Sequence, residues 1–395
     1  MRLFSRVFVL LLRTEAIQAV DDASNLLNNL FAYIMVTVND FTARFTSLNV
    51  YKKDKLENTQ NTYSKKEMTS TKKFENQASD LVINNNRIAL FVYILNLPTT
   101  ATFNKVQNLL HTLYTVAEQK KAFYTLDTLD IFVVFANWCN YCLFDEPYNW
   151  SDIYILQDDD ATLVPDALHR CIRRVEGSVP CHVKGGDEEE EEGKKEEVEK
   201  YKIVAGKGRG WGDFEFGGTF DYLHAGHKML LTMAAWISSE KVHAKCKECE
   251  EYMGVAVYID LSGYFVCYLT LVSFNEKVEM LSTKKYKEWI EPIERRMEHV
   301  QAFFYIINRK LVYLVTPIFD IYGATITDKN IEAIVVSEET KRGGEIINEE
   351  RLRRNMKVLK LFCIKMIVDI DGDACSKLSS TNIREKMAKK MQDGC

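Results

Sequence analysis

The residues best suited to chemistry lie in one short stretch, GGTFDYLHAGHK, at positions 217–228. His224 and His227 are three residues apart, a spacing that puts two side chains on one face of the first turn of a helix. Gly217 and Gly218 precede them and let a ligand approach the backbone closely. A strand that passes through these glycines into a helix would direct free backbone N–H groups and the positive helix end at one point. The pattern predicts a phosphate site, although a His-x-x-His pair also suits a metal ion.

The composition limits what can surround this stretch. The chain has 395 residues, 47% of them hydrophobic, and a net charge of −5. It is long enough for two or three domains with at least one full core. Any positive charge that binds phosphate must be local, so we expect no nucleic-acid partner. The ten cysteines show no compact disulfide framework, which favours a reducing compartment, the cytoplasm.

The first residues allow a second localisation. Arg2, Arg6 and Arg13 surround a short apolar run and precede the first acidic residue, Glu15, an arrangement compatible with an organellar leader. The run is too short to span a bilayer, and no other segment is apolar enough. We therefore expect no membrane partner.

Composition also divides the chain into two parts joined by an acidic linker, GGDEEEEEGKKEEVEK, at residues 185–200. Residues 1–184 are expected to hold a small α/β domain, because IALFVYILNL and LDIFVVFANW flank a helix-like segment. A polar stretch near 51–85 is expected to be disordered. Residues 201–395 alternate strand-like and helix-like runs, which predicts a parallel sheet covered by helices. The strand-like runs there are 201–205, 253–257, 310–319, 333–337 and 359–370.

The full string GGTFDYLHAGHKMLL resembles the T-F-D-x-x-H-x-G-H signature of the HxGH nucleotidyltransferase superfamily, and it looks most like the eukaryotic type of phosphopantetheine adenylyltransferase. Three later stretches match that family in order. STKKYKEWIEPIERR resembles its basic loop and helix, AIVVSEETKRGGEIINEER the segment that distinguishes it from cytidylyltransferases, and KLSSTNIREK the closing S-S-T-x-x-R motif. The resemblance covers residues 201 to about 390 and implies a Rossmann-like domain with a parallel sheet.

The resemblance implies transfer of AMP from ATP to 4′-phosphopantetheine, which gives dephospho-coenzyme A and pyrophosphate in a late step of coenzyme A biosynthesis. Such in-line transfer depends on positioning and charge stabilisation, so no protein nucleophile is required. Mg²⁺ is expected to arrive with ATP and to need no dedicated protein cage. The sequence contains no G-x-x-x-x-G-K-[ST] motif, so a separate dephospho-coenzyme A kinase is implied.

The resemblance also implies roles for individual residues. His227 would stabilise the transition state at the α-phosphate, supported by His224 and Lys284, with the adjacent Lys285 as an alternative to Lys284. Thr219 would contact the α-phosphate or the incoming phosphate, so Thr219 and Lys284 would also bind the second substrate. The other expected ATP contacts are Gly217, Gly218, Phe220, Ser379, Ser380, Thr381 and Arg384.

The residue types of the closing motif suit this role. Its hydroxyls would cap the last helix, and Arg384 would reach the β- and γ-phosphates from one turn along. Asp221 is open to three interpretations: a structural bond, a water bound to Mg²⁺, or the cap of the helix after it.

Two segments interrupt the family's spacing: GKGRGWGDFE at 206–215 and YIDLSGYFVCYLTLV at 258–272. We hypothesise that both come from an imperfect gene prediction, such as retained introns. An mRNA that carries both in frame would contradict this. If both are real, a degenerate, non-catalytic nucleotide-binding protein becomes an alternative. A cytidylyltransferase-like enzyme is the other alternative, and a preference for CTP over ATP would identify it.

Two cysteine patterns indicate other chemistry. The W-C-x-x-C string with Cys139 and Cys142 resembles a thioredoxin redox site, but a proline follows where the helix should continue. His243, Cys246 and Cys249 have a metal-like spacing, yet no second pair is evidently placed to complete four ligands. We favour neither interpretation and expect no metal ligand in the chain.

Overall fold

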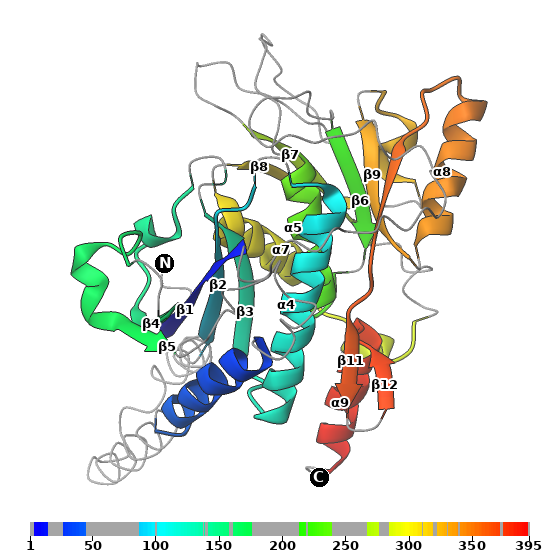
Figure 1. Ribbon diagram of the computed structural model, residues 1–395. Helices are drawn as coiled ribbons and strands as arrows, with labels where there is room; N and C mark the ends of the chain where they lie inside the picture. The colour runs from blue at the N-terminus through cyan, green and yellow to red at the C-terminus, as the bar shows by residue number, and fades with distance from the viewer. Residues whose placement is uncertain are drawn as a thin grey trace, which may run out of the picture. The chain divides into compact units, whose positions relative to one another are not determined.

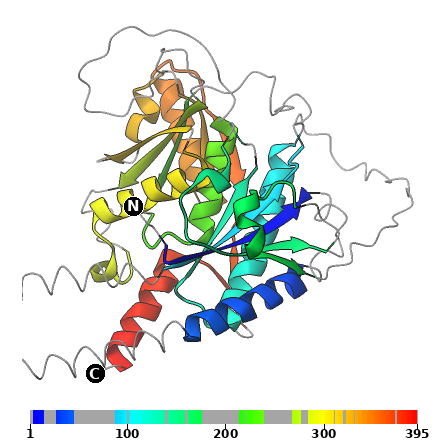
Figure 2. The ribbon, with the colours of Figure 1, turned by 90° about the vertical axis from the view of Figure 1, so that its left-hand side faces the viewer.

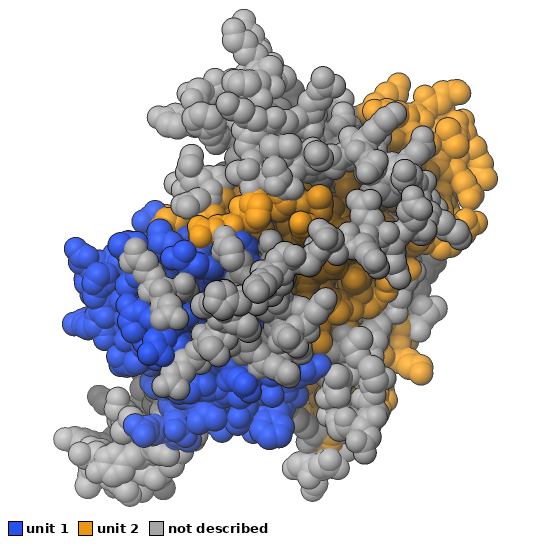
Figure 3. All heavy atoms as spheres, in the orientation of Figure 1, with its two compact units in different colours: residues 1–95, 116–133, 143–184 blue, residues 96–115, 134–142, 185–395 orange. Residues whose placement is uncertain are grey.

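The computed structural model (Figures 1 and 2) describes residues 4–14, 27–44, 87–98, 101–136, 138, 141–157, 161–175, 213–218, 220–238, 267–275, 284–309, 311–318, 322–329, 331–338, 340–371 and 374–393. Contacts divide the chain into two units, coloured separately in Figure 3. The boundaries predicted at residues 184 and 201 lie outside the described residues and stay predictions. Unit 1 comprises residues 1–95, 116–133 and 143–184, and unit 2 comprises residues 96–115, 134–142 and 185–395.

The sheet of unit 1 is centred on β1 (Arg6–Arg13). This strand is the short apolar run that was compatible with an organellar leader. β1 pairs in parallel with β2 (Ile88–Leu95) on one side and with β4 (Trp150–Leu156) on the other. Every residue of β2 is buried, as is typical of a strand covered on both faces. The edge strands are β3 (Leu129–Phe135) and β5 (Ile172–Val175), which gives the order β3-β2-β1-β4-β5.

The predicted strand, helix and strand of the N-terminal region are confirmed. β2 is followed by α4 (Phe103–Phe123) and then by β3 in the same sheet. The first half of α4, residues 103–115, belongs to unit 2 rather than to unit 1.

The sheet of unit 2 has the order β10-β9-β6-β7-β8, and every neighbouring pair is parallel. Helices α5 and α7 lie on one side of it and α8 on the other (Figure 1). This arrangement confirms the predicted Rossmann-like α/β fold. The strands are β6 (Asp213–Gly218), β7 (Cys267–Asn275), β8 (Leu311–Ile318), β9 (Ile331–Ser337) and β10 (Lys360–Ile364), and the helices are α5 (Ala225–Ser238), α7 (Ile293–Asn308) and α8 (Lys341–Arg353).

After β10 the chain forms a two-stranded antiparallel hairpin and the final helix. The apolar run 359–370, which reads as one strand in the sequence, is divided into β10 and β11 at Lys365–Ile367. The hairpin consists of β11 (Val368–Asp371) and β12 (Ala374–Lys377), and α9 (Ser380–Asp393) follows.

Two strands of unit 2 use residues that were predicted to be inserts. β6 includes residues 213–215 of the first segment, and β7 includes residues 267–272 of the second. The expected strands 201–205 and 253–257 lie outside the described residues. In this chain, therefore, both segments contribute strands beside the predicted phosphate site rather than surface loops alone.

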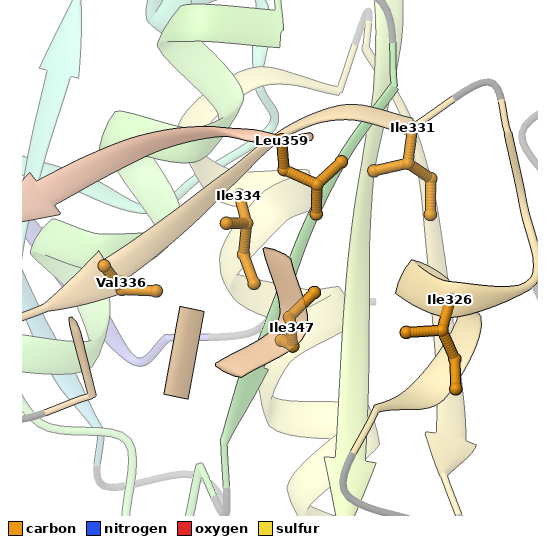
Figure 4. Close-up of a cluster of buried hydrophobic side chains, with 6 residues drawn as sticks. All are labelled: Ile326, Ile331, Ile334, Val336, Ile347 and Leu359. Carbon is orange, nitrogen blue, oxygen red and sulfur yellow. The ribbon is translucent and has the colours of Figure 1, made fainter. Parts of the chain in front are cut away.

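A cluster of buried aliphatic side chains holds α8 against the β9 and β10 side of the sheet (Figure 4). Gly344 of α8 allows the close approach, because a Cβ there would lie 2.8 Å from Cδ2 of Leu361. Gly344, the second of the adjacent glycines Gly343 and Gly344, thus has a packing role. The cluster consists of Ile326, Ile331, Ile334, Val336, Ile347 and Leu359. None of the helices within the described ranges combines the length and the apolar content that crossing a membrane requires.

Candidate active site

The candidate site lies where the direction of the sheet's connections changes. β6 and β9 are neighbours, but the chain continues from β6 to β7 on the other side, so the carboxyl ends of β6 and β9 form a topological switch point. Ligands of open α/β sheets bind in the crevice at such points. A cavity of about 350 Å³ lies there, lined by residues that follow β6 and by Ser337 at the end of β9.

The structure brings the two histidines of the motif together as their spacing predicts. α5 begins at Ala225, directly after His224. The rings of His224 and His227 stack with their centroids 3.9 Å apart and an interplanar angle of 21°, and both side chains line the cavity. Gly226 between them permits this packing, because a Cβ there would lie 3.1 Å from Cε1 of His224.

The other residues of the glycine-rich stretch are placed in part. Gly217 and Gly218 are the last two residues of β6, and Thr219 lies outside the described residues. Phe220 is fully buried, lines the cavity and has a positive φ of 47°. Its ring centroid lies 5.2 Å from that of His227, so it packs against the histidine pair.

Asp221 holds the loop between β6 and α5 to the start of α7. Its Oδ1 accepts a hydrogen bond of 2.8 Å from the backbone N–H of Glu291. In return, Oε2 of Glu291 accepts one of 2.8 Å from the N–H of Tyr222, which has a positive φ of 47°. Of the three interpretations open from the sequence, the contacts of Asp221 fit a structural bond.

The closing motif contacts the same aspartate. Oγ of Ser379 accepts from the N–H of Asn382 at 3.3 Å, so it caps α9 as expected. Oγ of Ser380 donates to the carbonyl oxygen of Asp221 at 2.8 Å. Ser379, Ser380 and Thr381 all line the cavity.

Arg384 lines the cavity, but its guanidinium is held within the protein. Nη1 donates to Oδ2 of Asp221, Nη2 donates to Oγ1 of Thr381 at 3.1 Å, and Nε donates to the carbonyl oxygen of Lys285 at 3.3 Å. Of the two adjacent lysines in the basic loop, Lys284 lines the cavity. Arg384 thus joins the histidine motif, the basic loop and the closing motif.

Burial and neighbouring polar groups shift the pKa values of Asp221, Glu291 and Tyr222. Burial raises the pKa of Asp221, although the bonds from Glu291 N–H and Arg384 oppose this effect. Burial also acts to raise the pKa of Glu291, but hydrogen bonds from His299 and from the N–H of Tyr222 outweigh it and lower that pKa. Burial and the two neighbouring carboxylates raise the pKa of the Tyr222 phenol.

The cavity also has a wall that sequence reasoning missed. None of these residues was among the expected site residues, although five of them lie within the stretches that resemble the family. Most are apolar, and they meet only where strands end, so their types alone did not point to a ligand. The wall consists of Leu230, Val335, Ser337, Thr340, Ile364, Lys365, Met366, Ile367 and Leu378. Its mostly apolar character complements the polar end formed by the histidines and the closing motif.

The competing cysteine patterns are only partly within the described residues. Cys139, His243, Cys246 and Cys249 lie outside them, and Cys142 is a free thiol. Over the described ranges, no group of three or more His, Cys, Asp or Glu side chains is placed to hold a metal ion.

Comparisons with known proteins locate the similarity in this unit. Residues 216–386 match the family model described as cytidylyltransferase-like. An uncharacterized protein of Schizosaccharomyces pombe is 35% identical over 44% of this chain and 47% of its own length. The phosphopantetheine adenylyltransferase of Saccharomyces cerevisiae is 32% identical over 45% of this chain and 50% of its own length. The chain therefore spans about half the length of these two relatives.

The match with an archaeal relative covers a larger share of that relative's length. The phosphopantetheine adenylyltransferase of Thermococcus gammatolerans is 34% identical over 42% of this chain and 84% of its own length.

Proposed function

Because this chain belongs to the phosphopantetheine adenylyltransferase-like family of nucleotidyltransferases, we propose that it transfers AMP from ATP to 4′-phosphopantetheine. A phosphate oxygen of 4′-phosphopantetheine attacks the α-phosphorus of ATP and forms a new P–O bond. The bond between the α-phosphorus and the oxygen bridging to the β-phosphate breaks, and pyrophosphate leaves. The other product is dephospho-coenzyme A, the substrate of a separate kinase.

The observation that carries this proposal is the stacked pair of His224 and His227 at the start of α5, facing the cavity. A helix start favours anions, and two imidazoles on one face can donate to oxygens of the same phosphate. His227 would donate to the α-phosphate oxygens as charge develops on them, with His224 supporting the triphosphate. Lys284 of the basic loop would add a positive charge near the phosphates.

The start of α9 supports a site for the rest of the triphosphate. Ser379, Ser380 and Thr381 bring hydroxyls and the positive helix end to the cavity. Arg384 would act on the β- and γ-phosphates from its position between Asp221 and Thr381. Mg²⁺ would come with ATP, because this ion is usually held by phosphates and waters with few protein ligands.

The test is pyrophosphate release by the full chain from ATP, with and without 4′-phosphopantetheine. We expect release that depends on 4′-phosphopantetheine and that is about 10²- to 10³-fold slower in His227→Ala. His169→Ala is a matched control, because His169 bonds to a backbone carbonyl in unit 1.

Each other outcome has a distinct meaning. Release from CTP but not from ATP would support the cytidylyltransferase-like alternative. A folded chain that binds ATP but releases no pyrophosphate would support the non-catalytic alternative. Equal rates for the wild type and His227→Ala would contradict the proposed role of the histidine.

A further inference from the structure

The first half of α4 contacts the segment between β10 and β11, although the two are far apart in the sequence. Oε1 of Gln107 accepts a hydrogen bond of 2.9 Å from the N–H of Lys365. Nε2 of His111 lies 3.0 Å from the carbonyl oxygen of Met366, and only a protonated Nε2 can donate to it. Asn108 adds a third contact, since its Oδ1 accepts from Nζ of Lys365 at 3.0 Å. Both partners of each contact belong to unit 2.

These contacts meet a need of the backbone. Lys365, Met366 and Ile367 lie between β10 and β11 and belong to neither strand. Backbone N–H and C=O groups withdrawn from water require partners, and α4 provides one for Lys365 and one for Met366. Gln107 is itself 5% exposed, so its carbonyl group is directed at this segment from a buried position.

The supported segment is part of the candidate active site. Lys365, Met366 and Ile367 all line the cavity. The carbonyl oxygen of Ile367 accepts from the N–H of Leu378 at 3.2 Å, and Leu378 directly precedes the closing motif. Displacement of the segment would therefore move both the apolar wall and the start of α9.

We propose that Gln107 and His111 are positioning residues for the nucleotide, holding residues 365–367 as the wall against which the base of ATP packs. The inference rests on the proposed function, because it assumes that this cavity binds ATP. The base must lie on the apolar side of the cavity, since the histidines, Lys284 and the closing motif occupy the phosphate side. The region before the acidic linker thus contributes to the nucleotide site through α4.

Four variants test this role in the full chain. Gln107→Leu and His111→Leu remove the acceptor and the donor, and each leaves a partly buried backbone group without its partner on α4. Gln107→Glu keeps an acceptor oxygen, and His111→Gln keeps an N–H near the position of Nε2. We expect each leucine variant to raise KM for ATP by about tenfold, with smaller changes in kcat and in KM for 4′-phosphopantetheine. The conservative variants should restore KM.

His169→Leu is the matched control. Nε2 of His169 lies 2.9 Å from the carbonyl oxygen of Val164, a contact of the same kind within unit 1. This variant should lower Tm as His111→Leu does, yet leave KM for ATP unchanged. A second readout needs no turnover: hydrogen exchange at the amide of Lys365 should become faster in Gln107→Leu and not in His169→Leu.

The outcomes separate this inference from the proposed function. If the wild type turns over ATP and both leucine variants retain its KM, or if exchange at Lys365 is unchanged in Gln107→Leu, the inference is wrong and the proposed function stands. If the wild type neither binds ATP nor releases pyrophosphate, both are wrong.

Discussion

Nη1 of Arg384 donates a hydrogen bond to Oδ2 of Asp221, and the two side chains are 1% and 0% exposed. The residues are 163 positions apart, so the pair ties the loop before α5 to the last helix. A buried arginine and carboxylate gain little net stability from pairing, but the loss of one partner leaves the other charge uncompensated. The pair therefore fixes the geometry of the site, and a substitution of either residue should destabilise the fold.

The first prediction follows from this pair. Asp221→Ala should lower the free energy of unfolding by about 3–5 kcal/mol, because Arg384 would stay buried with its charge unpaired. Asp152→Ala is the control: Asp152 pairs with Arg173 at 3.0 Å, but that arginine is 52% exposed, so the loss should be under about 1 kcal/mol. Urea unfolding followed by circular dichroism measures both. Equal losses of unfolding free energy in the two variants would show that the buried Asp221 pair contributes no more to stability than the exposed one.

The second prediction concerns Gly226. In Gly226→Ala the new methyl group would lie 3.1 Å from Cε1 and 3.2 Å from Nδ1 of His224, so the imidazole must move by a few tenths of an ångström. We expect a lower kcat, because the displaced imidazole no longer faces the phosphate correctly. Tm should change little, because the close contact is offset by the higher helix propensity of alanine, which exceeds that of glycine by about 1 kcal/mol.

Gly343→Ala in α8 is the matched control for Gly226→Ala, since a Cβ there meets nothing within 4 Å. It should leave kcat unchanged and keep or raise Tm. A Gly226→Ala enzyme with the kcat of the wild type would mean that the position of His224 is not critical.

The third prediction distinguishes the two adjacent lysines. Lys284 lines the cavity, whereas Lys285 provides its backbone carbonyl to Arg384. Lys284→Ala should lower kcat by about ten- to a hundredfold, because it removes a positive charge near the phosphates. Lys285→Ala keeps its carbonyl and should retain most of the activity. Steady-state pyrophosphate release measures both variants, and the reverse order would assign the role to Lys285.

The fourth prediction concerns acid stability. Burial acts to raise the pKa of Glu291, but the hydrogen bonds from His299 and Tyr222 N–H lower it below the ordinary value of 4.5. The unfolded chain then binds a proton at a higher pH than the folded chain does. The stability that Glu291 contributes is fully present above pH 4.5 and is lost as pH falls through the folded pKa.

Glu291→Gln should therefore be less stable than the wild type at neutral pH, and the difference should shrink as the medium is acidified. Tm measured from about pH 6 to about pH 3.5 tests this. Burial raises the pKa of Asp221 in both proteins and gives the opposite dependence. Glu291→Gln removes only the smaller upward effect of the Glu291 charge on that pKa, so the difference reports mainly on Glu291. A difference in Tm that stays constant over this range would contradict the assignment.

Local features of the sequence were sufficient to predict much of this protein. The three-residue spacing of His224 and His227 predicted a shared helical face, and the rings stack. The helix-like segment between IALFVYILNL and LDIFVVFANW is confirmed as α4, and the strands at the cores of IALFVYILNL and AIVVS are confirmed as well. These features depend on periodicity, burial and helix starts, which act over a few residues and are therefore visible in the sequence.

The tertiary structure alone decided which distant residues meet. No pattern in the sequence linked Gln107 to Lys365, because 258 positions separate them and neither belongs to a motif. The sequence suggested a phosphate contact for Arg384, which stays a prediction, but gave no sign that packing also pairs its guanidinium with Asp221. The sequence also made residues 206–215 an interruption before Gly217, whereas in the structure residues 213–216 form the strand that leads into it. Such outcomes depend on burial, charge pairing and backbone hydrogen bonds between segments, and these interactions arise only once the sheet has brought the segments together.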